Sequence, residues 1–134
     1  DLAAEVDRIT QGRGVNLVFD PVGGPDVARI TPVMAKDGAY FQYGALDNRN
    51  LSIPVMDILG KHLVFRGYEL FEITTVPEAL ARAKAFIFAG LESGQLKPLI
   101  DKVFPFERIA DAHRYMESNG QTGKIVVSVV EDLK

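Results

Sequence analysis

Residues 14–24 read GVNLVFDPVGG, and this stretch decides the fold class. Residues 15–19 form an almost continuous apolar run rich in β-branched and aromatic side chains, and residues 20–24 carry the Asp, Pro and Gly of a turn. An apolar run without alternation is typical of a strand that is covered on both faces, and such strands occur in parallel sheets. The stretch therefore predicts a buried parallel strand that ends at Asp20.

Helices and further strands alternate with this strand through the first two-thirds of the chain. We expect a helix containing Leu2, Val6 and Ile9, a helix over 26–34 in which Pro32 favours a kink, a strand over 39–43, a helix over 54–61 and a strand over 62–70. Strands that recur with helices at intervals of roughly 20 residues predict a doubly wound α/β sheet, whose crossovers are right-handed.

The remaining residues have a different character. The pattern predicts a long helix over 77–93, a strand over 99–106, a helix over 107–118 and a strand over 124–130. These two short strands need pairing partners that the sequence does not obviously provide. The first part supplies only three strands, whereas a sheet usually has about four to six. We therefore expect an incomplete fold.

Composition excludes several classes of function. The chain has 134 residues, no cysteine and a net charge of −3, so disulfides and thiolate chemistry are excluded. No basic stripe is present to neutralise phosphates, which argues against a nucleic-acid partner. No apolar run is long enough to span a membrane, and the first residues do not resemble a signal peptide. We therefore expect a cytoplasmic protein with no membrane or nucleic-acid partner.

A glycine-rich phosphate-binding turn is missing from the sequence. Dinucleotide-binding sheets normally carry G-x-G-x-x-G after the first strand, where the pyrophosphate binds, and this pattern does not occur in the chain. Gly12 and Gly14 precede a strand instead of following one, which favours an ordinary turn.

Six segments together resemble the medium-chain dehydrogenase/reductase superfamily, in particular its quinone oxidoreductase-like branch. They are residues 14–24, 39–45, 62–68, 104–107, 109–113 and 122–127. The resemblance implies a partial Rossmann-type doubly wound parallel sheet, later strands only, over residues 1–95. It also implies a strand–helix–strand tail over 96–134 that returns to a GroES-like catalytic domain. We therefore expect the chain to be the C-terminal part of a longer enzyme.

The resemblance also implies a function. The parent enzyme would transfer hydride from NADPH, or NADH, to a quinone or an activated alkene as its small-molecule substrate. An enoyl reductase and a zinc-dependent alcohol dehydrogenase of the same superfamily are alternatives. Zinc ligands in such enzymes lie outside the matching part, so zinc dependence stays undecided and we expect no zinc on this chain. The chain alone is expected to be inactive, with no catalytic residue of its own.

Ten residues are expected to contact the cofactor because they match positions that line the cofactor crevice of these enzymes. They are Asp20, Pro21, Val22, Gly23, Tyr43, Gly44, Ala45, Leu70, Phe71 and Lys124. Each also has a purely structural alternative. Asp20 could simply form a turn, Gly44 could end a strand and Lys124 could be solvated, and the apolar pair at 70–71 could be buried.

The strand over 62–70 would lie at the edge of the sheet. Its unpaired side is a template for pairing, and the resemblance implies a homodimer formed through this edge. A non-catalytic assembly module built on the same edge is an alternative of another class. A signalling receiver domain with a phosphorylated Asp20 is disfavoured, because the Mg²⁺ it needs would require further acidic groups at a neighbouring strand end.

Overall fold

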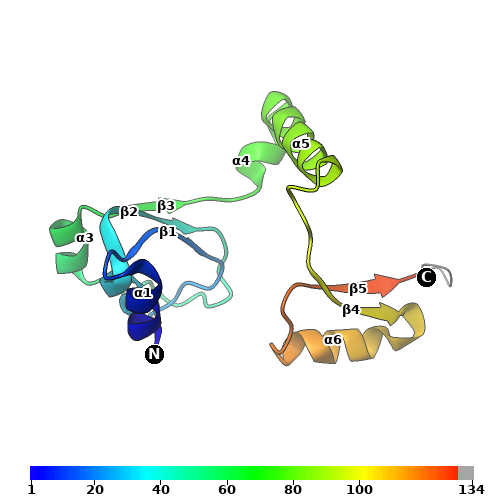
Figure 1. Cartoon of the computed structure of the whole chain (residues 1–134), viewed down its shortest axis with the longest axis horizontal. Coiled ribbons are helices and arrows are strands. Elements are labelled where there is room, and N and C mark those ends of the chain that lie inside the picture. Colours follow the sequence, from blue (N-terminus) through cyan, green and yellow to red (C-terminus); the bar gives the residue numbers. More distant parts are fainter. Residues whose placement is uncertain (130–134) are drawn as a thin grey trace. The chain divides into compact units, whose positions relative to one another are not determined.

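The structure is a computed structural model that describes residues 1–129 of the chain (Figure 1). Val130, the predicted end of the last strand, lies outside the described residues. Residue contacts divide the chain into a first unit, Asp1–Leu80, and a second unit, Ala81–Lys134. The predicted boundary at residue 95 concerns the domains of a longer parent and stays a prediction.

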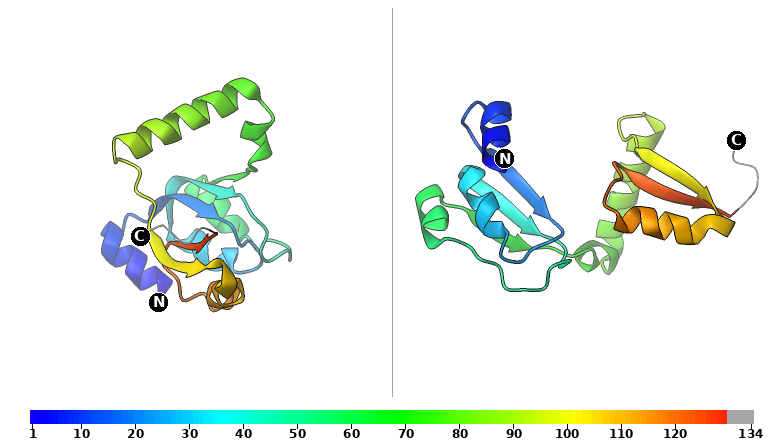
Figure 2. Two further views of the ribbon diagram at one scale, coloured as in Figure 1. Left: turned by 90° about the vertical axis from the view of Figure 1, so that its right-hand side faces the viewer. Right: turned by 90° about the horizontal axis from the view of Figure 1, so that it is seen from below.

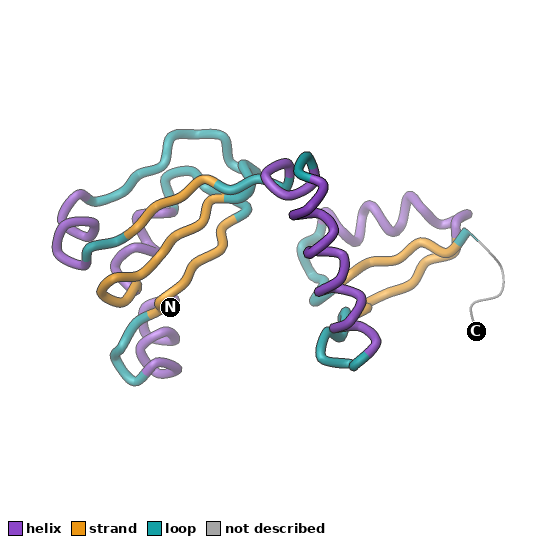
Figure 3. The backbone as a smooth tube through the Cα atoms, turned by 90° about the horizontal axis from the view of Figure 1, so that it is seen from above, coloured by secondary structure: helices purple, strands orange, loops and turns teal. Residues whose placement is uncertain are grey.

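The first unit is built on a three-stranded parallel sheet in the order β1-β2-β3. Its strands are β1 (Val15–Asp20), β2 (Met34–Gln42) and β3 (Val64–Gly67), which run side by side in Figure 3. Phe41 pairs with Phe19 on one side and with Arg66 on the other. The α/β fold class with parallel strands is therefore confirmed.

Four helices of this unit pack on one face of the sheet. They are α1 (Leu2–Thr10), α2 (Val27–Ile30), the 3-10 helix η1 (Thr31–Val33) and α3 (Val55–Lys61). Each of the other three contacts η1. On this face Val27 and Tyr40 are fully buried, and Met34 and Leu63 complete the core.

The opposite face of the sheet is open within this unit. Leu17 is 52% exposed, Phe19 58% and Val64 57%. The expectation that the strand over 15–19 is covered on both faces is therefore wrong for this unit. The strand order runs in one direction, and right-handed crossovers then bring both connections to the same face.

Three predicted elements differ by more than two residues at one end. The strand expected over 39–43 is the longer β2, which already begins at Met34. The helix expected over 26–34 is only α2 followed by η1, because Pro32 has no N–H to continue an α-helix, and Met34 already begins β2. The strand expected over 62–70 is only β3. His62 adopts a left-handed backbone with φ 54° and ends α3, while Leu70 caps the short helix α4 (Phe71–Thr74).

The second unit contains most of the long helix α5 (Pro77–Glu92) and a strand–helix–strand motif. The motif consists of β4 (Ile100–Pro105), the 3-10 helix η2 (Phe106–Arg108), α6 (Ile109–Glu117) and β5 (Lys124–Ser128). In Figure 2, α6 lies along the two strands, and Ala112 in α6 and Phe104 in β4 are both buried. The expectation that these strands lack partners is wrong, because β4 and β5 pair with each other in parallel.

Candidate functional site

The carboxyl ends of β1, β2 and β3 lie at one edge of the first sheet, because the three strands are parallel. Two turns leave this edge: the first turn, residues 21–24 after β1, and the second turn, residues 43–47 after β2. Open α/β sheets bind their ligands outside this edge.

Asp20 shapes the first turn from its base. Its side chain is 6% exposed, and its carboxylate accepts hydrogen bonds from the N–H of Val22 at 2.6 Å and of Gly23 at 3.2 Å. The hydroxyl of Tyr40 donates to the same carboxylate. Burial, together with the neighbouring Asp20, raises the pKa of Tyr40 well above its usual value, so the phenol remains a donor. The carboxylate of Asp20 is thus bonded within the protein, as its turn-forming alternative predicts.

The two turns are bonded directly to each other. The N–H of Leu46 donates to the carbonyl of Pro21 at 3.2 Å, and that of Asp47 donates to the carbonyl of Val22 at 2.9 Å. A Cβ atom on Gly44 would lie 2.5 Å from the carbonyl oxygen of Pro21. The glycine at 44 is therefore needed for contact between the turns, and this contact, not the approach of a ligand, is the reason the structure gives for it.

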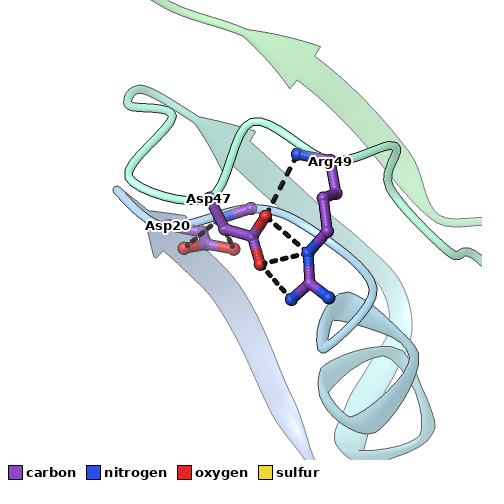
Figure 4. A network of polar contacts seen from close by, with 4 residues as sticks. Asp20, Asp47 and Arg49 are labelled. Carbon is purple, nitrogen blue, oxygen red and sulfur yellow. Dashed lines mark hydrogen bonds and ion pairs between the residues drawn. The ribbon is translucent and has the colours of Figure 1, made fainter.

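Asp47 and Arg49 form an ion pair beside the first turn (Figure 4). The Arg49 guanidinium contacts the carboxylate of Asp47 at 2.5 Å through Nη2 and at 2.9 Å through Nε, and these bonds lower the pKa of Asp47 to about 2. The same carboxylate occupies the place that a Cβ on Gly24 would take, while Gly24 has φ +70°. Gly23 and Gly24 are thus buried beside the second turn and the residues after it, whereas the side chain of Val22 is exposed.

Large apolar side chains are exposed along this edge. We call this set the apolar rim: Val22 (42% exposed), Tyr43 (47%), Leu46 (82%), Leu70 (65%) and Phe71 (62%). The alternative that residues 70 and 71 form a buried pair is therefore wrong. These side chains are large, apolar and exposed in the segments that follow the carboxyl ends of the strands, where open parallel sheets bind ligands.

The structure brings together seven of the ten residues expected to contact a cofactor. They are Asp20 and the six that lie in the two turns: Pro21, Val22, Gly23, Tyr43, Gly44 and Ala45. Leu70 and Phe71 follow β3 at the start of α4. Lys124 begins β5 in the second unit, where its N–H donates to the carbonyl of Leu99 at 2.8 Å and its side chain is exposed. Contact of any of the ten with a cofactor stays a prediction.

Three residues that position the turns were not singled out from the sequence. They are Tyr40, Gln42 and Asp47. The signal for Gln42 was a polar residue at the end of an apolar strand, two positions before a glycine. Tyr40 gave no signal, because a tyrosine in an apolar strand has the pattern of any core residue.

Residues 1–129 contain neither a metal-binding cluster nor a membrane-spanning helix. No group of three or more His, Asp or Glu side chains is arranged to hold a metal ion in this part of the chain. No helix in the described range is both long and apolar enough to cross a membrane.

Comparisons with known proteins place the chain in a family. A family model described as zinc-binding dehydrogenase matches residues 1–127. The synaptic vesicle membrane protein VAT-1 homolog of Rattus norvegicus is 29% identical over 95% of this chain, which corresponds to 35% of that protein. The chain thus spans about a third of the length of this curated relative.

Solved structures agree with this assignment. The CurK enoyl reductase is 25% identical and superposes with a TM-score of 0.71 over 96% of this chain and 38% of its own. The Escherichia coli quinone oxidoreductase complexed with NADPH, at 23% identity, shares the fold with a TM-score of 0.75 over 95% of this chain and 40% of its own. Since the family match covers nearly the whole sequence, the chain belongs to the zinc-binding dehydrogenase family, as the resemblance to medium-chain dehydrogenases predicts.

Proposed function

We propose that the chain is the C-terminal part of an NAD(P)H-dependent oxidoreductase that transfers hydride to a quinone or an activated alkene. The observation that carries the proposal is the edge itself: two bonded turns and the apolar rim lie where an open parallel sheet binds ligands, in a chain of dehydrogenase ancestry. The parent would be longer, because no G-x-G-x-x-G turn occurs in these residues and the rat relative is almost three times as long.

When bound, the nicotinamide supplies the hydride, and the protein contributes binding, orientation and exclusion of water. The first and second turns would hold the nicotinamide half. The apolar rim would exclude water from the ring, which would strengthen the polar contacts around it. No acid–base pair on this chain is required.

The acceptor is proposed from two relatives. An activated alkene is supported by the likeness to the CurK enoyl reductase at 25% identity. A quinone is supported more weakly, because the quinone oxidoreductase of Escherichia coli shares the fold at 23% identity. Its complex with NADPH supports NADPH as the cofactor, whereas the likeness to an NAD-dependent alcohol dehydrogenase, at 26% identity, supports NADH.

We also propose that β3 forms a homodimer through its free edge. Within residues 1–129, β3 pairs only with β2, so the backbone groups on its other side have no strand partner. Arg66 is held by Glu72 at 2.6 Å, and both side chains are partly exposed. The ion pair therefore balances the positive charge of Arg66 on this short edge strand.

Titration of this chain with NADPH, followed by nicotinamide fluorescence, tests the proposal. We expect saturable binding that is weaker than about 10 µM, because the turn that binds the pyrophosphate is absent from the sequence. An absence of saturable binding would remove the nicotinamide site from this edge. Binding tighter than about 10 µM would contradict the claim that the main phosphate site lies in another part of the parent.

A further inference from the structure

Gln42, the last residue of β2, bridges the ends of two strands with one side chain. Its amide Nε2 donates to the carbonyl of Asp20 at 3.2 Å and to the carbonyl of Gly44 at 2.6 Å. Asp20 ends β1, and Gly44 lies in the second turn. The two amide hydrogens therefore fix the distance between the base of the first turn and the middle of the second.

The surrounding backbone is shaped around this amide. The carbonyl of Asp20 also accepts the N–H of Tyr43 at 3.0 Å, so both turns converge on one oxygen. A Cβ atom on Gly23 would lie 3.0 Å from the Nε2 of Gln42, and Gly23 has φ +80°. Gly23 thus leaves room for the amide and adopts a backbone that glycine allows without strain.

The other end of the same amide is left without a partner. Its Oε1 atom is buried and has no hydrogen-bond partner among the residues that the structure describes. A buried acceptor without a donor destabilises a fold, so an apolar side chain of similar size would avoid that cost. What an apolar side chain cannot do is donate to both turns at once.

We propose that Gln42 is a positioning residue, which holds the first and second turns at the spacing that a nicotinamide dinucleotide needs. The inference rests on the proposed function and extends it to a residue that touches no cofactor itself. Its amide acts through the backbone of residues 20–24 and 43–47.

The test compares Gln42→Met and Gln42→Glu with the unchanged chain. Each protein is titrated with NAD⁺ and followed by amide NMR at several pH values between about 8 and about 5. The pyrophosphate of NAD⁺ keeps its charge over this range. Gln42→Met removes both donors, and we expect NAD⁺ affinity to fall about fivefold at every pH. In Gln42→Glu, two carbonyl oxygens face the new carboxyl group and raise its pKa. We expect weak binding near pH 8 and partial recovery near pH 5, where the protonated carboxyl donates one bond.

Gln95→Glu is the matched control, because residue 95 is exposed and the same substitution there should leave affinity and its pH dependence unchanged. Without NAD⁺, the amide signals of Gly23 and Gly44 should move with pH in Gln42→Glu only. This measurement reports the spacing between the first and second turns even if NAD⁺ binds weakly. Equal affinity of Gln42→Met and the unchanged chain, or a Gln42→Glu affinity that ignores pH, would overturn the inference. If the unchanged chain shows no shifts with NAD⁺, the proposed function fails instead.

Discussion

A Cβ atom placed on Gly44 would lie 2.5 Å from the carbonyl oxygen of Pro21, whereas a Cβ on Gly60 would meet nothing within 4 Å. These two glycines look equivalent in the sequence, since each follows an apolar stretch. Their environments differ because one packs between two turns and the other lies in α3 with open space around it. Which glycine matters is therefore decided by tertiary contacts.

Gly44→Ala and Gly60→Ala should change stability in opposite directions. We expect Gly44→Ala to lower the free energy of unfolding by about 1–3 kcal/mol, because the methyl group forces the turns apart. Gly60→Ala should raise it by about 0.5–1 kcal/mol, because alanine restricts the unfolded chain and favours the helix. Urea unfolding of the three proteins measures both changes. A stable Gly44→Ala protein would mean that the turns are not packed as described.

At the scale of elements, periodicity predicted the type of each long helix and strand, and local backbone effects set their ends. The helices around α1, α3, α5 and α6 and the strands around β1 and β2 occur where the pattern places them. The strand expected over 62–70 is shorter because residue 62 adopts a left-handed backbone and residue 70 caps a helix. The pattern of apolar and polar residues indicates neither of these backbone features. The sequence did not predict the pairing of β4 with β5, because the two parallel strands are separated by a helix. Local residue patterns do not indicate a partner at that distance along the chain.

Gly67→Pro tests the proposed edge pairing of β3. The N–H of Tyr68 donates to Gln42 in the neighbouring strand, so the alternating backbone directs the N–H of Gly67 to the free edge. Proline at 67 removes that donor without breaking the existing ladder, and a Cβ there meets nothing within 4 Å.

Sedimentation should show a dimer for the unchanged chain and for the matched control Gly67→Ala, and a monomer for Gly67→Pro. Phe65 is a poor site for this test, because its ring stacks on the buried Tyr40 at 5.0 Å and belongs to the core. A Gly67→Pro dimer of unchanged mass would remove β3 from the interface.

At the scale of the whole molecule, the sequence predicted the fold class and the location of the candidate site better than the interactions within it. A parallel strand that ends in Asp-Pro-x-Gly-Gly already places the first turn at a ligand-binding edge. The roles of Tyr40, Gln42 and Asp47 depend on contacts with partners that lie 20 to 25 positions away in the sequence. Local sequence patterns carry no sign of such contacts.

The first unit also offers a competing location for a ligand. A cavity of about 680 Å³ lies at the amino edge of its sheet, lined by α1, residues 12–14, residues 32–36 and Lys61. Lys61 donates there to the carbonyl oxygens of Thr31 and Pro32, at 3.0 and 2.5 Å. Its charge is thus engaged by the protein, whereas the apolar rim at the carboxyl edge is open.

Mapping of NADP⁺ binding by amide chemical shifts on the whole chain distinguishes these two edges. We expect the shifted signals to belong to residues 21–24, 43–47 and 70–71. Shifts confined to residues 12–14, 32–36 and the end of α3, with none in the two turns, would contradict this expectation.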